Sequence, residues 1–191
     1  KARVTLVEKH RMGGDCLNVG CVPSKGIIAA ARAAHAAKSG GAKFGVNIDP
    51  SGVEIDFPAV MERMRKLRAG ISKNDSAQRF AELGVDVFIG QASFVDSQTI
   101  AVGEQRLPFR KAVICSGARA DAPPIPGLNE IDYLTNESLF NLTKLPQRLG
   151  IIGAGPVGCE MAQAFARLGS EVLLVEATHG ILPREDADAA E

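Results

Sequence analysis

The sequence has no tryptophan, a single tyrosine and no excess of charge of either sign. Its 22 Lys and Arg residues balance 22 Asp and Glu residues. A nucleic-acid or polybasic membrane binder needs a clustered positive excess, so the charge balance argues against both classes. Apolar runs such as Gly26–Ala31 are far shorter than the roughly 20 residues that cross a bilayer. We therefore expect a cytoplasmic protein that binds neither nucleic acid nor membrane.

The chain of 191 residues also lacks an initial methionine and the apolar stretch of a signal peptide. A strand pattern begins directly after Lys1, so we interpret the sequence as a piece of a longer polypeptide. Hydrophobic residues make up 46% of it, which is enough for a core, and the length suits one or two domains.

Two short runs near the ends of the chain share a form, because each ends in Val-Glu. Ala2–Glu8 and Ser170–Glu176 are typical of buried parallel strands with an acid at the carboxyl end. Before the second run come another strand pattern (Leu149–Ile152), the glycine turn GAGPVG (Gly153–Gly158) and a helical stretch (Cys159–Leu168). This order predicts a dinucleotide-binding unit. The alternative is a glycine-rich βαβ unit that binds nothing.

The residues of this unit have distinct physical roles in such a site. Gly153 allows the tight turn, Gly155 lets a pyrophosphate approach the backbone, and Gly158 lets the helix pack close to the strand. The free N–H groups of the helix would hold the phosphate. Glu176 would accept hydrogen bonds from ribose hydroxyls and repel a 2′-phosphate, so the sequence favours NADH over NADPH. By analogy, Glu8 ends the second strand of an earlier unit whose glycine turn we expect before the chain begins; alternatively it is a surface acid.

Only two of the four cysteines are close in sequence, Cys16 and Cys21, in the string GGDCLNVGCVPSK. Zinc would need two further ligands, and the nearby histidines show no ligand spacing. A structural disulfide is unusual in a chain of cytosolic character. A redox pair is the interpretation that remains favoured, and the sequence predicts no metal site.

A helix is predicted from Pro23, which suits a first turn, to about Lys38. Cys21 then lies at the N-terminal end of this helix, where the helix dipole and Lys25 would lower the pKa of its thiol.

A second helix is predicted over Phe57–Lys73, with Val60, Met64, Leu67 and Ile71 packed inward. We interpret its basic face, Arg63, Arg65, Lys66 and Arg68, as solvated; a patch for an anionic partner is the alternative. Short strands are predicted at Val85–Ile89, Ser93–Val95, Thr99–Val102 and Ala112–Cys115.

The string GGDCLNVGCVPSK resembles the redox-active disulfide signature of the class I pyridine nucleotide-disulfide oxidoreductases, which are FAD-dependent flavoproteins. The resemblance covers essentially the whole chain, including KAVICSG (Lys111–Gly117) and the linker APPIPGL (Ala122–Leu128). The preceding VEKHRMGG and the later HGILPRED (His179–Asp186) are most similar to the mercuric reductase-like branch. Dihydrolipoamide dehydrogenases come next.

The resemblance implies a three-layer α/β fold with two Rossmann-like units, both incomplete in this chain, and an inserted β-meander. Residues 1–120 would form the FAD-binding domain without its first βα unit, 121–147 a linker, and 148–191 the start of the NAD(P)-binding domain. The family's C-terminal dimerisation domain, which supplies a His–Glu pair to the partner subunit, is not part of the sequence. None of His10, His35 or His179 corresponds to that histidine. The full-length protein is expected to be a homodimer.

The implied chemistry carries electrons from NAD(P)H through FAD to a Cys16–Cys21 disulfide, and on to a small disulfide or Hg(II). Cys21 would face the flavin, and Cys16 would be the interchange thiol that meets the substrate. Lys25 and Glu160 correspond to an ion pair beside the flavin, although without the resemblance both would be interpreted as surface charges. The positions implied to contact FAD are Glu8, Gly13, Gly14, Asp15, Lys25, Ala92, Ser116 and Gly117.

Three features depart from the family pattern. Cys115-Ser116 replaces the common Ala-Thr, and we expect Cys115, like Cys159, to be a buried packing residue. Asp15 stands where many members have Thr, and Glu176 favours NADH whereas mercuric reductases usually use NADPH. Two other hypotheses are a nucleotide-binding module without turnover and a domain that a Cys16–Cys21 disulfide merely stabilises.

Overall fold

The structure, a computed structural model, describes residues 2–177, 180–183 and 185–190, so His179 of the HGILPRED motif lies outside the described residues. The described ranges contain seven strands and seven α-helices, with a few short 3-10 and π-helical segments between them. Their bounds are β1 (Val4–Glu8), α1 (Gly14–Val19), α2 (Cys21–His35), α3 (Phe57–Ser72), α4 (Ala77–Glu82), β2 (Val85–Ile89), β3 (Ala92–Phe94), β4 (Thr99–Val102), β5 (Gln105–Pro108), α5 (Asn136–Leu139), β6 (Arg148–Ile152), α6 (Pro156–Leu168), β7 (Glu171–Val175) and α7 (Ala187–Ala190).

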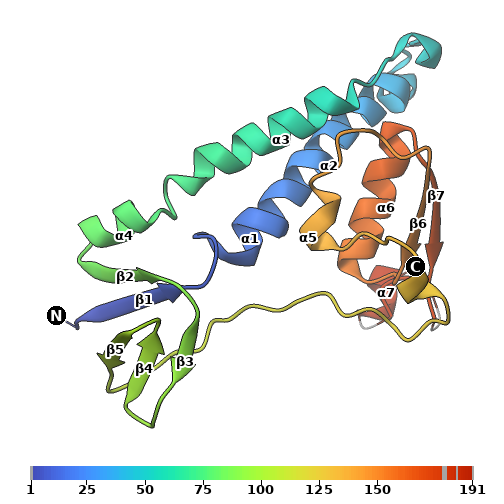
Figure 1. The fold of residues 1–191 in the computed structure, drawn as a ribbon. Helices are drawn as coiled ribbons and strands as arrows, with labels where there is room; N and C mark the ends of the chain where they lie inside the picture. The colour runs from blue at the N-terminus through green and yellow to red at the C-terminus, as the bar shows by residue number, and fades with distance from the viewer. Residues whose placement is uncertain (1, 178–179, 184, 191) are drawn as a thin grey trace.

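The strands form three small sheets. β1 pairs with β2 in parallel and β6 pairs with β7 in parallel, whereas β3, β4 and β5 form an antiparallel meander. The order β6, α6, β7 is a βαβ unit, as the glycine turn between its strand and helix predicts. Figure 1 shows the meander beside β1 and β2, and an extended segment that leads from it to α5 and β6.

Local sequence explains where the long helices begin and end. Asp56 caps α3, its carboxylate accepting a hydrogen bond from the backbone N–H of Ala59 at 2.9 Å. Pro156 occupies the first turn of α6, and Gly169 ends that helix in the left-handed region at φ 113°. Helices α3 and α6 therefore form where the apolar periodicity and the capping residues agree.

One hydrophobic core joins α2, α3, α5 and α6, which come from both halves of the chain. Phe57 of α3 and Phe165 of α6 meet with ring centroids 6.0 Å apart. Gly26 of α2 lies against Met64 of α3, and a Cβ at Gly26 would come within 3.1 Å of that side chain. The buried members of this cluster are Ile27, Ala31, Ala34, Phe57, Met61, Met64, Phe140, Met161, Ala164, Phe165 and Leu168.

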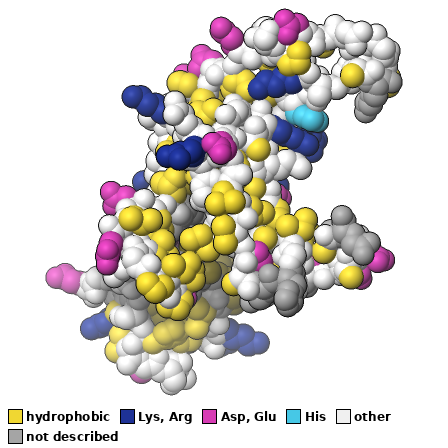
Figure 2. All heavy atoms as spheres, turned by 90° about the vertical axis from the view of Figure 1, so that its right-hand side faces the viewer, with side chains coloured by type: hydrophobic (Ala, Val, Ile, Leu, Met, Phe, Trp, Pro, Cys, Tyr) yellow, Lys and Arg dark blue, Asp and Glu magenta, His cyan; other side chains and the backbone are white. Residues whose placement is uncertain are grey.

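The predicted three layers are not formed by the described residues. Leu149, Ile151 and Val172 of the β6–β7 sheet pack against the core. The opposite face of that sheet is open, because Leu173 is 66% exposed and Ile152 is 53% exposed. Figure 2, which views the molecule from the side of β6 and β7, shows hydrophobic side chains gathered on its surface. The helices therefore cover only one face of the β6–β7 sheet.

The strand predicted at Ala112–Cys115 is wrong. Residues 109–127 contain no helix or strand, and Val113 and Ile114 are 86% and 73% exposed. The β-branched run has strand propensity, but no neighbouring strand pairs with it among the described residues, and a strand needs a partner for its backbone groups. The meander instead closes with β5, whose sequence QRLP carries little alternation.

The inward face predicted for α3 is only partly correct. Met64 is buried and Val60 packs against the core, but Leu67 and Ile71 are each 39% exposed.

In the part of the chain that the structure describes, no helix combines the length and the apolarity needed to cross a membrane.

Candidate functional site

Cys16 and Cys21 lie together at the surface, as the redox interpretation requires. Cys16 is in α1, Cys21 is the first residue of α2, and both are exposed free thiols. A hydrogen bond between the two side chains is the main cause that raises the pKa of the Cys16 thiol, with a smaller contribution from desolvation. The short connection through Gly20 thus places two exposed thiols on adjoining helices.

Lys25, one helical turn after Cys21, forms an ion pair with Glu160 of α6. Its Nζ donates to both carboxylate oxygens of Glu160, at 2.6 and 2.7 Å. The two side chains are 59% and 39% exposed, so a pair of this kind contributes only about 0–1 kcal/mol to stability. A groove of about 440 Å³ between α2 and α6 contains this pair. The predicted pairing is thus present in the structure, and its role beside a flavin remains a prediction.

Glu8 ends β1 and folds back on the turn that follows it. Its carboxylate accepts hydrogen bonds from the backbone N–H groups of His10 at 2.7 Å and Arg11 at 3.2 Å. The backbone N–H of Gly90 donates to the Glu8 carbonyl at 2.8 Å. The exposed Ala92 of β3 follows Gly90 by two residues, so it also lies near Glu8. Two of the predicted cofactor contacts therefore lie at one edge of the β1–β2 sheet.

The start of α1 meets the turn at Ser116–Gly117, a second place where predicted cofactor contacts come together. Gly13 and Gly14 turn the chain with positive φ angles of 95° and 61°. The Asp15 carboxylate accepts a hydrogen bond from the backbone N–H of Ala118 at 3.3 Å. Gly117 has φ 71°, a conformation that favours glycine, and a Cβ there would lie 2.5 Å from Asp15 Oδ2.

The glycine turn before α6 has the tight geometry that its sequence predicts. Gly153 has φ 103°, and a Cβ at Gly158 would collide with the Gly153 carbonyl oxygen. A Cβ at Gly155 would meet nothing within 4 Å, so open space lies beside that backbone. The Glu176 carboxylate, at the end of β7, accepts hydrogen bonds from the backbone N–H groups of Ala154 at 2.7 Å and Ala177 at 2.8 Å. The Glu8 carboxylate thus binds the turn that follows its own strand, whereas the Glu176 carboxylate also binds the glycine turn before α6.

Sequence reasoning missed two residues that contact the cysteine-bearing segment. Arg68 of α3, interpreted as part of a solvated face, donates from Nη1 to the Asn18 carbonyl at 3.0 Å. Asn136 of α5 donates from Nδ2 to the Val19 carbonyl at 3.3 Å. A signal for Arg68 existed: it lies on the same helical stripe as the buried residues Met61 and Met64. Nothing in the local sequence marks Asn136.

The remaining cysteines differ from the prediction that both are buried. Cys115 is exposed, because the strand that would have buried it is not formed. Cys159 is half-buried, and its thiol donates to the Ala154 carbonyl at 3.2 Å. In the described ranges, His, Cys, Asp and Glu side chains form no group of three that could hold a metal ion.

Comparison with known proteins connects this arrangement to a family. The whole chain, residues 1–191, matches the family model described as pyridine nucleotide-disulphide oxidoreductase. The mercuric reductase of Bacillus cereus is 35% identical over 190 residues, covering 100% of this chain and 30% of that protein. The mercuric reductase of Streptomyces lividans is 38% identical over 177 residues, covering 90% of this chain and 37% of that protein.

Among solved structures, the HOCl-induced flavoprotein disulfide reductase RclA from Escherichia coli superposes with a TM-score of 0.80 at 31% identity. That match covers 99% of this chain and 40% of RclA, so the chain spans well under half of the proteins that it resembles. The complete match to the family model is decisive for classification: this chain belongs to the pyridine nucleotide-disulphide oxidoreductase family of flavoproteins.

Proposed function

We propose that this chain is the redox-disulfide and nucleotide-binding part of a mercuric reductase-like flavoprotein oxidoreductase. Two electrons from NAD(P)H would reach the Cys16–Cys21 pair by way of FAD, and the reduced thiols would pass them to a small substrate. Family membership implies both cofactors, and the identity with mercuric reductases favours this branch.

The observation that carries the proposal is the pair of exposed free thiols, Cys16 in α1 and Cys21 at the start of α2, which interact closely enough to raise the pKa of Cys16. Two adjacent thiols can store two electrons and two protons by closing and opening one disulfide. Their exposure leaves them open to a substrate, whereas structural cysteines are usually buried. The Lys25–Glu160 ion pair lies nearby, with Lys25 on the same helix as Cys21. Because so exposed an ion pair contributes little to stability, stability gives no strong reason for its presence.

The residues present suit the two nucleotides. Bound FAD would supply a two-electron acceptor that links a hydride donor to a thiol pair. Glu8 offers a carboxylate to ribose hydroxyls, and the turn of Gly13 and Gly14 offers backbone N–H groups where phosphates would pass. For NAD(P)H, the open space beside Gly155 would admit a pyrophosphate, and Glu176 would face its ribose.

For the substrate, we favour Hg(II), because thiolates are soft ligands and this pair is exposed. Glu176 carries a carboxylate where a 2′-phosphate would need a cation, so we also propose NADH as the preferred donor. Steady-state kcat/KM values of the full-length protein for Hg(II), dihydrolipoamide and glutathione disulfide, each with NADH and with NADPH, test both statements. A higher value for glutathione disulfide than for Hg(II) would instead support a disulfide reductase.

Replacement of Cys16 by Ser in the full-length, FAD-loaded protein tests the electron route. Substrate reduction should fall to background, because the thiol that would meet the substrate is gone. Loss of flavin absorbance on mixing with NADH should persist, since that transfer does not use Cys16. Cys115→Ser serves as the control and should keep activity. Full substrate turnover by the Cys16→Ser protein would contradict the proposal.

A second candidate is a nucleotide-binding module without turnover. It is favoured by one observation, that the chain spans 30–42% of the mercuric reductases compared with it. On this hypothesis the purified 191-residue chain binds NADH in a titration but reduces neither Hg(II) nor a disulfide. Catalytic turnover by that chain would exclude it.

A further inference from the structure

The short helix α1 carries Cys16 and ends two residues before Cys21, and its C-terminal carbonyl groups accept hydrogen bonds from side chains far along the sequence. A helix leaves its last carbonyls without partners inside the helix. Here the Asn18 carbonyl accepts from Arg68 of α3 at 3.0 Å, and the Val19 carbonyl accepts from Asn136 of α5 at 3.3 Å. Both bonds are partly buried, so water competes with them less than at an open surface.

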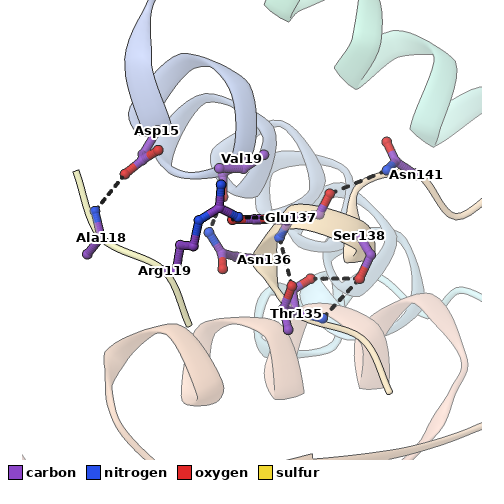
Figure 3. A network of polar contacts seen from close by, with 9 residues as sticks. All are labelled: Asp15, Val19, Ala118, Arg119, Thr135, Asn136, Glu137, Ser138 and Asn141. Atoms are coloured by element: carbon purple, nitrogen blue, oxygen red, sulfur yellow. Dashed lines mark hydrogen bonds and ion pairs between the residues drawn. The ribbon is translucent and has the colours of Figure 1, made fainter. Parts of the chain in front are cut away.

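The other end of α1 is held as well. Asp15 accepts from the backbone N–H of Ala118, and the next residue, Arg119, donates from Nη1 to both carboxylate oxygens of Glu137 at 2.8 and 3.0 Å. Glu137 follows Asn136 on α5, so the contacts form a closed circuit through α1, the extended segment and α5 (Figure 3). Helix α1 therefore has hydrogen bonds to α3, to α5 and to the extended segment.

These contacts bear on thiol chemistry because they hold α1 in the conformation in which both cysteines are thiols. The two sulfurs are not bonded to each other here, so they must move closer to form a disulfide, and the helix that carries Cys16 must adjust with them. A contact that is stronger in the dithiol form than in the disulfide form favours the dithiol by that difference. The backbone around a thiol pair thus becomes part of what sets its reduction potential.

We propose that Arg68 and Asn136 are positioning residues that raise the reduction potential of the Cys16–Cys21 pair by holding the C-terminal end of α1. This inference rests on the part of the proposed function that makes these cysteines a redox couple. Oxidation of the pair joins the two sulfurs and releases two electrons and two protons. Glutathione disulfide accepts them and becomes two molecules of glutathione.

The test is equilibration of the 191-residue chain in glutathione buffers of graded potential, followed by alkylation and mass analysis of the peptide that carries both cysteines. Arg68→Ala and Asn136→Ala should each shift the equilibrium toward the disulfide by about three- to tenfold; tenfold corresponds to about 30 mV for a two-electron couple. Arg68→Lys, which keeps a donor, should restore most of the original equilibrium.

Two variants serve as matched controls. Arg65→Ala removes a guanidinium from the same helix, and Asn141→Ala removes an amide that donates to the Glu137 carbonyl instead of α1. Both should leave the potential unchanged, and far-UV circular dichroism confirms that each variant is folded. Should Arg68→Ala fail to fold, Asn136→Ala decides alone.

Equal potentials in wild type, Arg68→Ala and Asn136→Ala would overturn the positioning role while leaving the redox couple intact. Failure of wild type to form a Cys16–Cys21 disulfide in any buffer would overturn the proposed function and this inference together.

Discussion

At the scale of single residues, the hydrogen bond between Cys16 and Cys21 changes how Cys16 titrates. The bond raises the pKa of the Cys16 thiol, so at a given pH below that value a smaller fraction is thiolate. The thiolate is the nucleophile in alkylation and in disulfide exchange. Cys16 therefore gains reactivity only at higher pH than an isolated thiol, unless a base removes its proton.

Replacement of Cys21 by Ala should lower the pKa of Cys16 toward its ordinary value, because the hydrogen bond that raises it is lost. The rate of Cys16 alkylation by iodoacetamide at pH 8 should rise severalfold, and its pH profile should move to lower pH. Mass analysis of the Cys16 peptide gives the rate, with Cys115 in the same samples as the internal control. An unchanged profile would show that Cys21 does not control this titration.

At the scale of elements, two glycines of the turn before α6 are expected to have different roles, Gly158 in packing and Gly155 in ligand binding. Gly158→Ala should destabilise the chain by about 1–3 kcal/mol, because its Cβ would collide with the Gly153 carbonyl and force α6 away from β6. Gly155→Ala should change stability by less than about 1 kcal/mol, since a Cβ there meets open space. Urea unfolding followed by circular dichroism measures both effects.

For NADH binding, the larger effect is expected from the Gly155 variant and the smaller one from the Gly158 variant. Gly155→Ala should weaken NADH binding, because the added methyl group would lie where the pyrophosphate approaches the backbone. Fluorescence titration with NADH gives the dissociation constant. Equal stability losses in the two variants would contradict the packing argument, and unweakened binding by Gly155→Ala would contradict the ligand argument.

The sequence could predict elements whose signal is local. Apolar periodicity and capping residues located α2, α3 and α6 to within a few residues, and the Val-Glu endings located β1 and β7. Pairing is not local, so Ala112–Cys115 has strand propensity but finds no strand partner among the described residues. For the same reason the burial predicted for Cys115 was wrong, and the contacts of Arg68 and Asn136 with α1 became visible only when three distant segments were brought together.

At the scale of the whole molecule, one core supports both the cysteine segment and the nucleotide turn. The helix that begins at Cys21 and the helix that follows the glycine turn pack on each other, and Phe165 is among the side chains buried between them and α3. The two units thus share their hydrophobic stabilisation. We therefore expect residues 1–120 and 148–191 to unfold together.

Phe165→Ala tests this expectation, because it removes a fully buried ring from the shared core. Loss of such a ring costs about 3–5 kcal/mol, whereas Leu173→Ala, on the open face of β7, should cost within about 0.5 kcal/mol. Circular dichroism and alkylation of the half-buried Cys159 should report the same urea midpoint in wild type, and the same lowered midpoint in Phe165→Ala. Two separate transitions in wild type would show that the units unfold independently, which would contradict a shared stabilisation by this core.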